Sequence, residues 1–422
     1  MKRDVIDRDQ RKAPVSNGSV ADAAADAEAP MRILFFDHTA AMSGGEIALL
    51  HLVQALDRRR YLPLVVLGAE GPLRRKLEEA GIAVEVLPLA SNVAQTRKDS
   101  LKAGSLLRVR ALFQSLAYAL RLARLLKMRG ADLVHTNSLK ADLLGGVAAR
   151  LARVPVVWHV RDRIADDYLP ASAARVFRLL CRVIPQYIIA NSEATLQTLY
   201  AATERASVIP SGTARTQLRV VHDGIPDPAL PVGVSGWSSP LIGLVGRISP
   251  WKGQHIFIEA ASQVLLRYPA ARFQIIGSAM FGEEAYEGQV RSQVSALGLE
   301  DHVEFLGFCE DVYTRINALD ILVHASTTGE PFGQVVVEGM VAGKPVVATR
   351  GGGVPEIVLD GETGYLAPMG DAGAMADRLC DLLGDPERSR RMGEAGRERV
   401  LQHFTIDSTA RKVEAIYREF RS

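Results

Sequence analysis

The sequence of 422 residues has few cysteines and no long apolar run, and each absence excludes a class of protein. The three cysteines, Cys181, Cys309 and Cys380, lie far apart and have no paired metal-ligand spacing. This predicts free thiols in a reducing, cytoplasmic compartment rather than disulfides or a metal centre. No run of about 18 apolar residues occurs, so we expect no membrane-spanning helix. A formal net charge of only +2 gives no signal for nucleic-acid binding.

Residues 1–30 also lack a continuous apolar stretch, and their charged residues alternate with Ala, Asp and Ser. A secretory signal needs an apolar core, so this segment is not expected to be one. We predict a disordered leader.

From residue 31 the chain alternates short β-branched runs with longer amphipathic stretches, a pattern typical of helices packed on parallel sheets. A stretch rich in Gly, Pro and Ser follows Asp223 and predicts a linker. We therefore expect an α/β protein with two Rossmann-like domains facing across a cleft: 31–228, a linker at 229–240, and 241–405. The expected strands are 32–36, 63–67, 83–87, 132–135, 155–159, 187–190, 218–221, 241–245, 272–276, 303–305, 321–324, 345–348 and 364–367.

The segment from Gly329 to Gly339 carries two carboxylates, Glu330 and Glu338, around a Pro-Phe-Gly turn between an expected strand and an expected helix. A helix N-terminus at Gly333 would present unpaired N–H groups and a partial positive charge, which suit a diphosphate. Two hydrogen-bond acceptors, one in the turn and one further along the helix, suit a ligand with two polyhydroxylated rings. The alternative is that Glu330 caps the helix and Glu338 is solvated.

A second segment, Leu241 to Gln254, is a buried strand followed by a glycine turn with two cations. Glycine at position 246 lets the backbone come close to a ligand. Arg247 and Lys252 would place a rigid fork and a mobile point charge at the same strand end, and together they could neutralise a diphosphate. The alternative is two surface cations flanking a loop.

Several first-half strands end in polar residues, which is expected of a site because ligands of open α/β sheets bind at the carboxyl ends of strands. These ends are Asp37-His38, His135 to Ser138, His159 to Asp162 and Asn191-Ser192.

Taken in order, these motifs resemble those of glycosyltransferase family 4, the retaining, sugar-nucleotide-dependent transferases of the GT-B fold. Ser43-Gly44-Gly45-Glu46 is similar to the family's glycine-rich loop, which usually reads Gly-Gly-Ala-Glu. Trp158-His159, Gly246-Arg247 with Lys252-Gly253, and the two glutamates follow, so the match covers nearly the whole chain after residue 30. The resemblance implies that the last helix, roughly Ser408 to Phe420 within 406–422, crosses back onto the first domain.

The resemblance also implies roles for the motif residues. Glu330 would bond hydroxyls of the donor sugar, Glu338 would hold the ribose, and His159 would lie near the sugar. Arg247 and Lys252 would stabilise the departing diphosphate. The other expected donor-binding residues are Gly44, Gly45, Gly246, Gly277, Gly307, Phe308, Phe332, Gly333, Gln334 and Val335, and the expected acceptor contacts are Glu46, Asn137, Arg161 and Asp162.

Metal and cofactor chemistry is not expected. Many transferases hold a metal with an Asp-x-Asp pair, and the only such pair is Asp7-Arg8-Asp9 in the leader. The family is thought to use a front-face substitution in which the leaving phosphate takes the acceptor's proton. A double displacement would instead need a carboxylate beside the anomeric carbon.

Three other functions remain open on the sequence. A sugar-nucleotide 2-epimerase of the same fold would turn over donor without acceptor, and a non-catalytic sensor would bind donor without transfer. A dinucleotide oxidoreductase is disfavoured because the turn at Gly243 to Gly246 lacks the three-glycine fingerprint and its acidic partner.

The stretch 97–129 holds nine Lys or Arg and the single acid Asp99, interleaved with apolar residues. Such a helix can lie on an anionic membrane, which would suit an envelope polysaccharide or lipid-linked acceptor. The alternative is a core-packed helix with a solvated basic face. The sequence does not indicate an oligomeric state.

Overall fold

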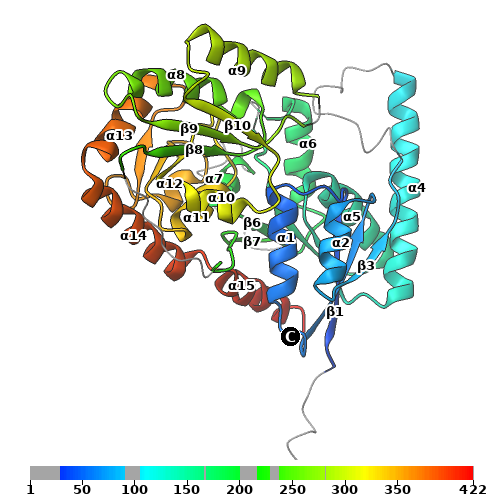
Figure 1. Ribbon diagram of the computed structural model, residues 1–422. Helices are drawn as coiled ribbons and strands as arrows, with labels where there is room; N and C mark the ends of the chain where they lie inside the picture. Colours follow the sequence, from blue (N-terminus) through cyan, green and yellow to red (C-terminus); the bar gives the residue numbers. More distant parts are fainter. Residues whose placement is uncertain are drawn as a thin grey trace, which may run out of the picture.

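The computed structural model describes residues 29–90, 105–165, 168–199, 216–228, 237–280 and 282–421. Parts of three predicted segments lie outside these residues: 1–28 of the expected leader at 1–30, 229–236 of the expected linker at 229–240, and 97–104 of the basic stretch at 97–129. Two parallel sheets form the framework, one in each half of the molecule (Figure 1).

The first sheet has seven strands in the order β3-β2-β1-β4-β5-β6-β7. They are β1 (Met31–Asp37), β2 (Tyr61–Leu67), β3 (Ala83–Val86), β4 (Leu133–Thr136), β5 (Val156–Val160), β6 (Tyr187–Ala190) and β7 (Gln217–Val220). The second sheet has six strands in the order β10-β9-β8-β11-β12-β13. They are β8 (Leu241–Val245), β9 (Arg272–Ile276), β10 (Val303–Gly307), β11 (Ile321–His324), β12 (Val346–Thr349) and β13 (Tyr365–Ala367). Every expected strand is present, and the expected two-domain α/β class is confirmed.

Helices cover both faces of the first sheet because successive side chains of a strand point to opposite faces. Ile33 and Phe35 of β1 share one core with helices α1 (Gly44–Ala55), α2 (Pro72–Glu79) and α15 (Ile406–Arg418). Leu34 and Phe36 face a second core with α4 (Ser105–Arg129), α5 (Leu139–Ala152) and α6 (Ala171–Cys181). A short helix, α7 (Glu193–Thr198), follows β6.

The second sheet is covered in the same way. One core contains α8 (Gln254–Leu265), α9 (Glu284–Ala296) and α13 (Ala372–Gly384). The other contains α10 (Val312–Ala318), α11 (Gln334–Val341), α12 (Val354–Ile357) and part of α14 (Pro386–His403). A 3-10 turn, η4 (Pro250–Lys252), leads into α8.

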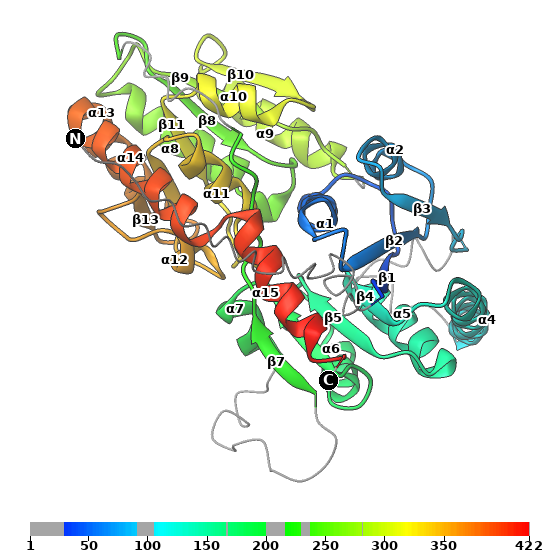
Figure 2. The same cartoon turned by 90° about the horizontal axis from the view of Figure 1, so that it is seen from below.

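The chain crosses between the domains at two adjacent segments. Ile225 and Thr405 form an isolated parallel bridge, and the Ile225 amide donates to the Phe404 carbonyl at 3.0 Å. A Cβ on Gly224 would lie 2.3 Å from the Thr405 carbonyl oxygen, so only glycine fits this close approach. After the crossing, α15 lies along the first domain (Figure 2). There it buries Val413 and Tyr417 in the core. The implied return of the last helix is confirmed.

In each sheet the strand order reverses at one place, between β1 and β4 and between β8 and β11. Ligands of open α/β sheets bind at such switch points, outside the carboxyl ends of the strands. The predicted motifs lie at both. Among the described helices none is long and apolar enough to cross a membrane.

Candidate active site

The switch point of the first domain carries a closed set of polar side chains. Asp37 ends β1, and it accepts hydrogen bonds from Asn137 Nδ2 at 2.6 Å and from Ser138 Oγ at 3.1 Å, just past β4. Asn137 Nδ2 also donates to the Gly45 carbonyl at 3.1 Å. Asp37 and Asn137 are buried, so these bonds hold the glycine-rich loop against the two strand ends.

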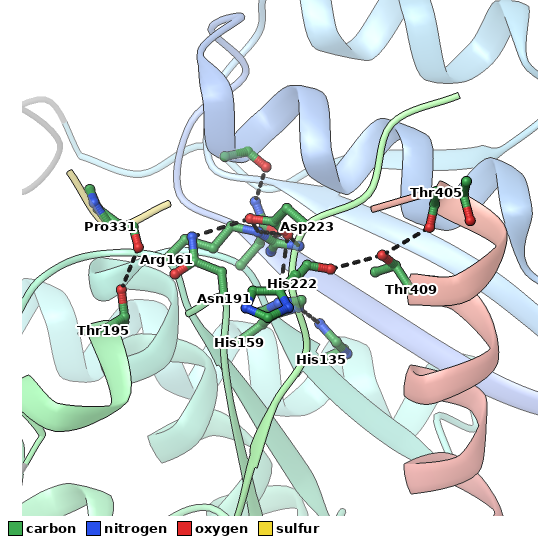
Figure 3. Close-up of polar contacts among 12 residues, drawn as sticks. His135, His159, Arg161, Asn191, Thr195, His222, Asp223, Pro331, Thr405 and Thr409 are labelled. Carbon is green, nitrogen blue, oxygen red and sulfur yellow. Dashed lines mark hydrogen bonds and ion pairs between the residues drawn. The ribbon is translucent and has the colours of Figure 1, made fainter. Parts of the chain in front are cut away.

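Arg161 joins this set to the segment that crosses between the domains (Figure 3). Its Nε and Nη2 each lie 3.0 Å from Asp223 Oδ1, and its Nη1 donates to Asn137 Oδ1. Asn191 Nδ2 donates to the other oxygen of Asp223 at 3.2 Å. The Arg161 and Asp223 side chains are each 5% exposed. Asp223 is therefore the hub of a buried, charge-assisted network.

His159 is fully buried beneath that network. Its Nδ1 lies 3.1 Å from His135 Nε2, and His135 Nδ1 lies 2.7 Å from the hydroxyl of Tyr417 on α15. Burial, followed by the charge of Arg161, holds the pKa of both imidazoles well below the usual range, so both rings are neutral. With Tyr417 donating, the remaining N–H of His159 points toward Asp223, 3.9 Å away.

Glu46 lies in the first turn of α1 and is buried. Burial, followed by the charge of Asp37, raises the pKa of Glu46 to about 7. The Ser43 hydroxyl donates to Glu46 instead of capping the helix. Glu46 can therefore exist in either protonation state near neutral pH.

Three of the glycines expected to bind the donor lie at neighbouring strand ends of the second sheet. Gly246, Gly277 and Gly307 follow or end β8, β9 and β10, and all three have positive φ. A Cβ on Gly277 would lie 2.1 Å from the Gly246 carbonyl oxygen, whereas one on Gly307 would meet nothing within 4 Å. Glycine is required for packing at 277 and leaves open space at 307. Phe308 follows with 64% of its surface exposed, so a base could stack on it.

Glu330 is held by three side chains. Lys252 donates to its Oε1, Ser326 Oγ donates at 2.6 Å, and His324 Nε2 lies 3.1 Å away. Burial alone would raise the pKa of Glu330, but Lys252 and His324 hold it well below its usual range. The carboxylate is ionised, and Lys252 still has two N–H groups for another anion.

Glu338 is a different kind of carboxyl group. It lies in α11, is buried, and burial raises its pKa to about 7, against the opposing effects of Gln334 and Lys252. Gly333 caps this helix at φ 123°, a conformation that favours glycine. Phe332 is 3% exposed and packs on His222, so its side chain belongs to the core.

Arg247 lies where the two domains meet. Burial lowers the pKa of its guanidinium, and the opposing charges include Tyr168 and Glu46 from the first domain as well as Glu330. Trp251 lies beneath both cations, 4.5 Å from Lys252 Nζ and 5.9 Å from Arg247 Cζ, measured to the ring centroid. The predicted cation pair and Glu330 thus lie together, opposite the glycine-rich loop.

Comparison with known proteins identifies both halves. The Glycosyl transferase 4-like domain model matches residues 43–224, and the Glycosyl transferases group 1 model matches residues 235–399. The chain belongs to glycosyltransferase family 4. Its two sheets and crossing helix are the GT-B fold, because solved GT-B enzymes superpose on nearly all of it.

Similar proteins come from several bacteria. A putative glycosyltransferase of Bacillus subtilis, EpsD, is 37% identical over 39% of this chain and 42% of its own length. D-inositol 3-phosphate glycosyltransferase of Corynebacterium efficiens is 29% identical over 68% of this chain and 71% of its own. The structure of HepE from Anabaena, in complex with UDP and glucose, has a TM-score of 0.76 and 29% identity, covering 92% of this chain and 99% of that one.

Within this family 4 site, the structure brings Arg247, Lys252, Glu330 and Glu338 together, as the sequence predicts. It also brings together Glu46, Asn137 and Arg161 at the first switch point. Asp162 accepts a hydrogen bond from the Leu139 amide at 3.3 Å. His159 is fully buried and contacts His135, so a direct contact with the sugar stays a prediction.

Other members of the site were not predicted from the sequence. Asp223 follows a strand, ahead of the expected linker, and Ser326 and His324 precede Glu330 without a motif of their own. The signal that could have revealed Ser326 and His324 is that both are polar and lie within six positions of Glu330. The described residues contain no group of three or more His, Cys, Asp or Glu arranged to hold a metal ion.

Proposed function

We propose that this chain is a retaining, metal-independent and cofactor-independent hexosyltransferase. It moves a sugar from a UDP-sugar donor to an envelope polysaccharide or lipid-linked glycan. The observation that carries the proposal is the ionised Glu330, fixed by Lys252, His324 and Ser326 at the turn into α11. A preorganised carboxylate beside two cations suits a sugar whose hydroxyls donate and whose diphosphate is anionic.

In this proposal Arg247, Lys252 and the N-terminus of α11 at Gly333 bind the diphosphate, because they place positive charge at one strand end. Glu330 accepts from the sugar hydroxyls and Glu338 accepts from the two ribose hydroxyls. The base lies over Gly277 and Gly307 against Phe308. UDP is chosen because HepE, 29% identical, is solved with UDP and glucose.

The transfer step follows the front-face route of the family. The acceptor oxygen forms a bond to the anomeric carbon while the bond from that carbon to the phosphate oxygen breaks. The acceptor's proton passes to the departing phosphate. The two cations and the helix N-terminus stabilise the charge that develops there, so this chain's residues need supply no covalent nucleophile.

The acceptor is proposed to meet Glu46, Asn137, Arg161 and Asp162 of the first domain. Relatives support a glycan: one is named as a lipopolysaccharide core biosynthesis mannosyltransferase of Rhizobium meliloti, 31% identical over 42% of this chain. His159 is proposed to act through Asp223 and Arg161, which it underlies.

A peripheral position on the inner face of the membrane fits such an acceptor. Helix α4 leaves Leu112, Phe113 and Leu116 exposed, at 70%, 67% and 47%. Further along the same helix, Arg121, Arg124, Lys127 and Arg129 are exposed. An exposed apolar surface followed by basic residues favours an anionic lipid surface over water alone. Binding to vesicles with anionic lipid, lost at high salt and in Phe113→Asp, is the expected result.

The test of the proposed function is a transfer assay with UDP-, GDP- and ADP-sugars, with chelator present. NMR of the product reports the anomeric configuration. An α-configured donor giving an α-linked product supports the proposal. Inversion, turnover of donor into an epimer, or a requirement for added divalent metal would contradict it.

A further inference from the structure

The main chain on both sides of Glu330 is held by the other domain. Arg163 Nη1 donates to the Gly329 carbonyl at 3.0 Å. The hydroxyls of Ser192 and Thr195, at the start of α7, converge on the Pro331 carbonyl at 2.5 and 3.1 Å. Figure 3 shows the bond from Thr195. The residue before Glu330 and the residue after it are thus both bonded to the first domain.

These contacts are closely packed. Ser192 and Thr195 are fully buried although they lie at the end of a strand and the start of a helix. On the other side of the turn, the Gly353 amide donates to the Glu330 carbonyl at 2.9 Å. A Cβ on Gly352 would lie 1.8 Å from that carbonyl, so the turn has no room to shift in that direction. The segment 329–331 is therefore sandwiched between the first domain and the 352–353 loop.

The local geometry at the start of α7 directs the hydroxyls of Ser192 and Thr195 toward the second domain. The Thr195 amide donates to Ser192 Oγ at 2.9 Å, which occupies the oxygen as acceptor and leaves its proton for Pro331. Next to it, the carboxylate of Glu356 on α12 accepts from the amides of Glu193 and Ala194, each at 2.9 Å. The start of α7 thus binds the second domain at two points, one of them adjacent to Glu330.

We propose that Ser192, Thr195 and Arg163 are positioning residues that form an interdomain clamp and set the place of Glu330 for the transfer step. This inference rests on the proposed function, because Glu330 is there the acceptor for the sugar hydroxyls. The first domain then does more than present the acceptor: by closing, it fixes the donor-side carboxylate. Closure of the two domains then aligns the sugar in the same step.

Loss of a clamp that positions Glu330 should affect kcat, whereas loss of an ordinary interdomain contact should affect only stability. The double variant Ser192→Ala/Thr195→Val removes both hydroxyls and keeps nearly the same volume. We expect kcat to fall about 10- to 100-fold, the size that a small misplacement of a reacting group produces, while KM for the donor and Kd for the nucleotide change less than about threefold. Backbone amides of 329–341 should exchange with deuterium faster, with or without nucleotide.

The matched control is Thr198→Ala on the same helix. Thr198 Oγ1 accepts from the Ile164 amide and donates to the Thr195 carbonyl, so its bonds stay within the first domain. This variant should lower the melting temperature without the split between kcat and KM. Should the double variant fail to fold, Arg163→Gln removes the bond to Gly329 and carries the same expectations.

Unchanged kcat together with unchanged exchange at 329–341 would overturn the clamp. So would a double variant whose kcat, KM and melting temperature change only as in Thr198→Ala. If the parent chain turns over no nucleotide sugar, the proposed function fails separately. The exchange measurement then decides: faster exchange in the double variant supports the clamp, and equal exchange overturns it.

Discussion

The two switch points of this molecule use their charged residues in opposite ways. In the first domain, Asp37, Asn137, Arg161 and Asp223 are bonded to one another inside the fold. In the second, Lys252 and Glu330 form one pair with spare donors, and Glu338 is a buried carboxyl with a pKa of about 7. The first arrangement makes a rigid platform. The second keeps binding capacity for a ligand, and this difference predicts different consequences of mutation on the two sides.

The largest expected effect is on stability, from the hub of the first domain. Asp223→Ala leaves Arg161, whose side chain is 5% exposed, without its carboxylate. An uncompensated buried charge costs about 3–5 kcal/mol, so urea unfolding should show a loss of that order. The comparison variant is Glu330→Ala, which leaves Lys252 with 18% exposure and should cost less. Equal losses of unfolding free energy in the two variants would contradict the distinction between a rigid platform in the first domain and a ligand site in the second.

The next effect is on catalysis, from the second domain. Glu330→Gln keeps the shape of the side chain but weakens its attraction for sugar hydroxyls and Lys252. We expect kcat to fall about 10²- to 10³-fold, as for loss of one preorganised polar group, with nucleotide affinity nearly intact by calorimetry. The exposed acid Glu362 supplies a control in Glu362→Gln. A parallel loss of nucleotide affinity in Glu330→Gln would contradict the division between sugar and nucleoside carboxylates.

A smaller effect concerns pH. Glu338 has its pKa raised from 4.5 to about 7, and only its ionised form can accept from both ribose hydroxyls. Nucleotide-sugar affinity should therefore rise about tenfold between pH 6 and pH 8, following the ionised fraction. A sugar conjugate is the right probe because its diphosphate has no terminal phosphate to titrate there.

The same shift has a consequence for stability. The folded chain binds the Glu338 proton more tightly than the unfolded chain, so this group lowers stability as pH rises from 4.5 to about 7. Glu338→Gln should flatten both this slope and the pH dependence of binding. Persistence of both in Glu338→Gln would assign them to another group, with Glu46 the next to test.

The smallest effect is expected at the base. Phe308 is 64% exposed beside the open Gly307, so Phe308→Ala should weaken nucleotide binding by about 0.5–1.5 kcal/mol, or roughly twofold to tenfold. Leu266, 86% exposed on another surface, gives the control variant Leu266→Ala. Unaltered calorimetric affinity in Phe308→Ala would place the base elsewhere.

Much of the fold could be read from the sequence because the strands are short apolar runs in a regular order. The segment from Gly329 to Gly339 was also readable, since glycine, proline and two carboxylates mark a strand-to-helix junction. Local patterns were sufficient for both.

The buried network was not readable. Val156 to Val160 is buried throughout, so periodicity gave no sign that His159 points inward to His135. Asp223 and Arg161 are 62 positions apart, and Tyr417 reaches His135 across 282. The contacts of Ser192 and Thr195 with Pro331 likewise join two domains. Side-chain partners so distant in sequence leave no local pattern.

The most direct measurement is calorimetric titration of UDP and UDP-glucose into the wild-type chain, Lys252→Ala and Arg247→Ala, with chelator present. We expect binding to the wild type without metal and a loss of about tenfold or more in each variant, because two fixed cations would hold the diphosphate. Binding that needs divalent metal, or that persists unchanged in both variants, would contradict a phosphate site built from these residues.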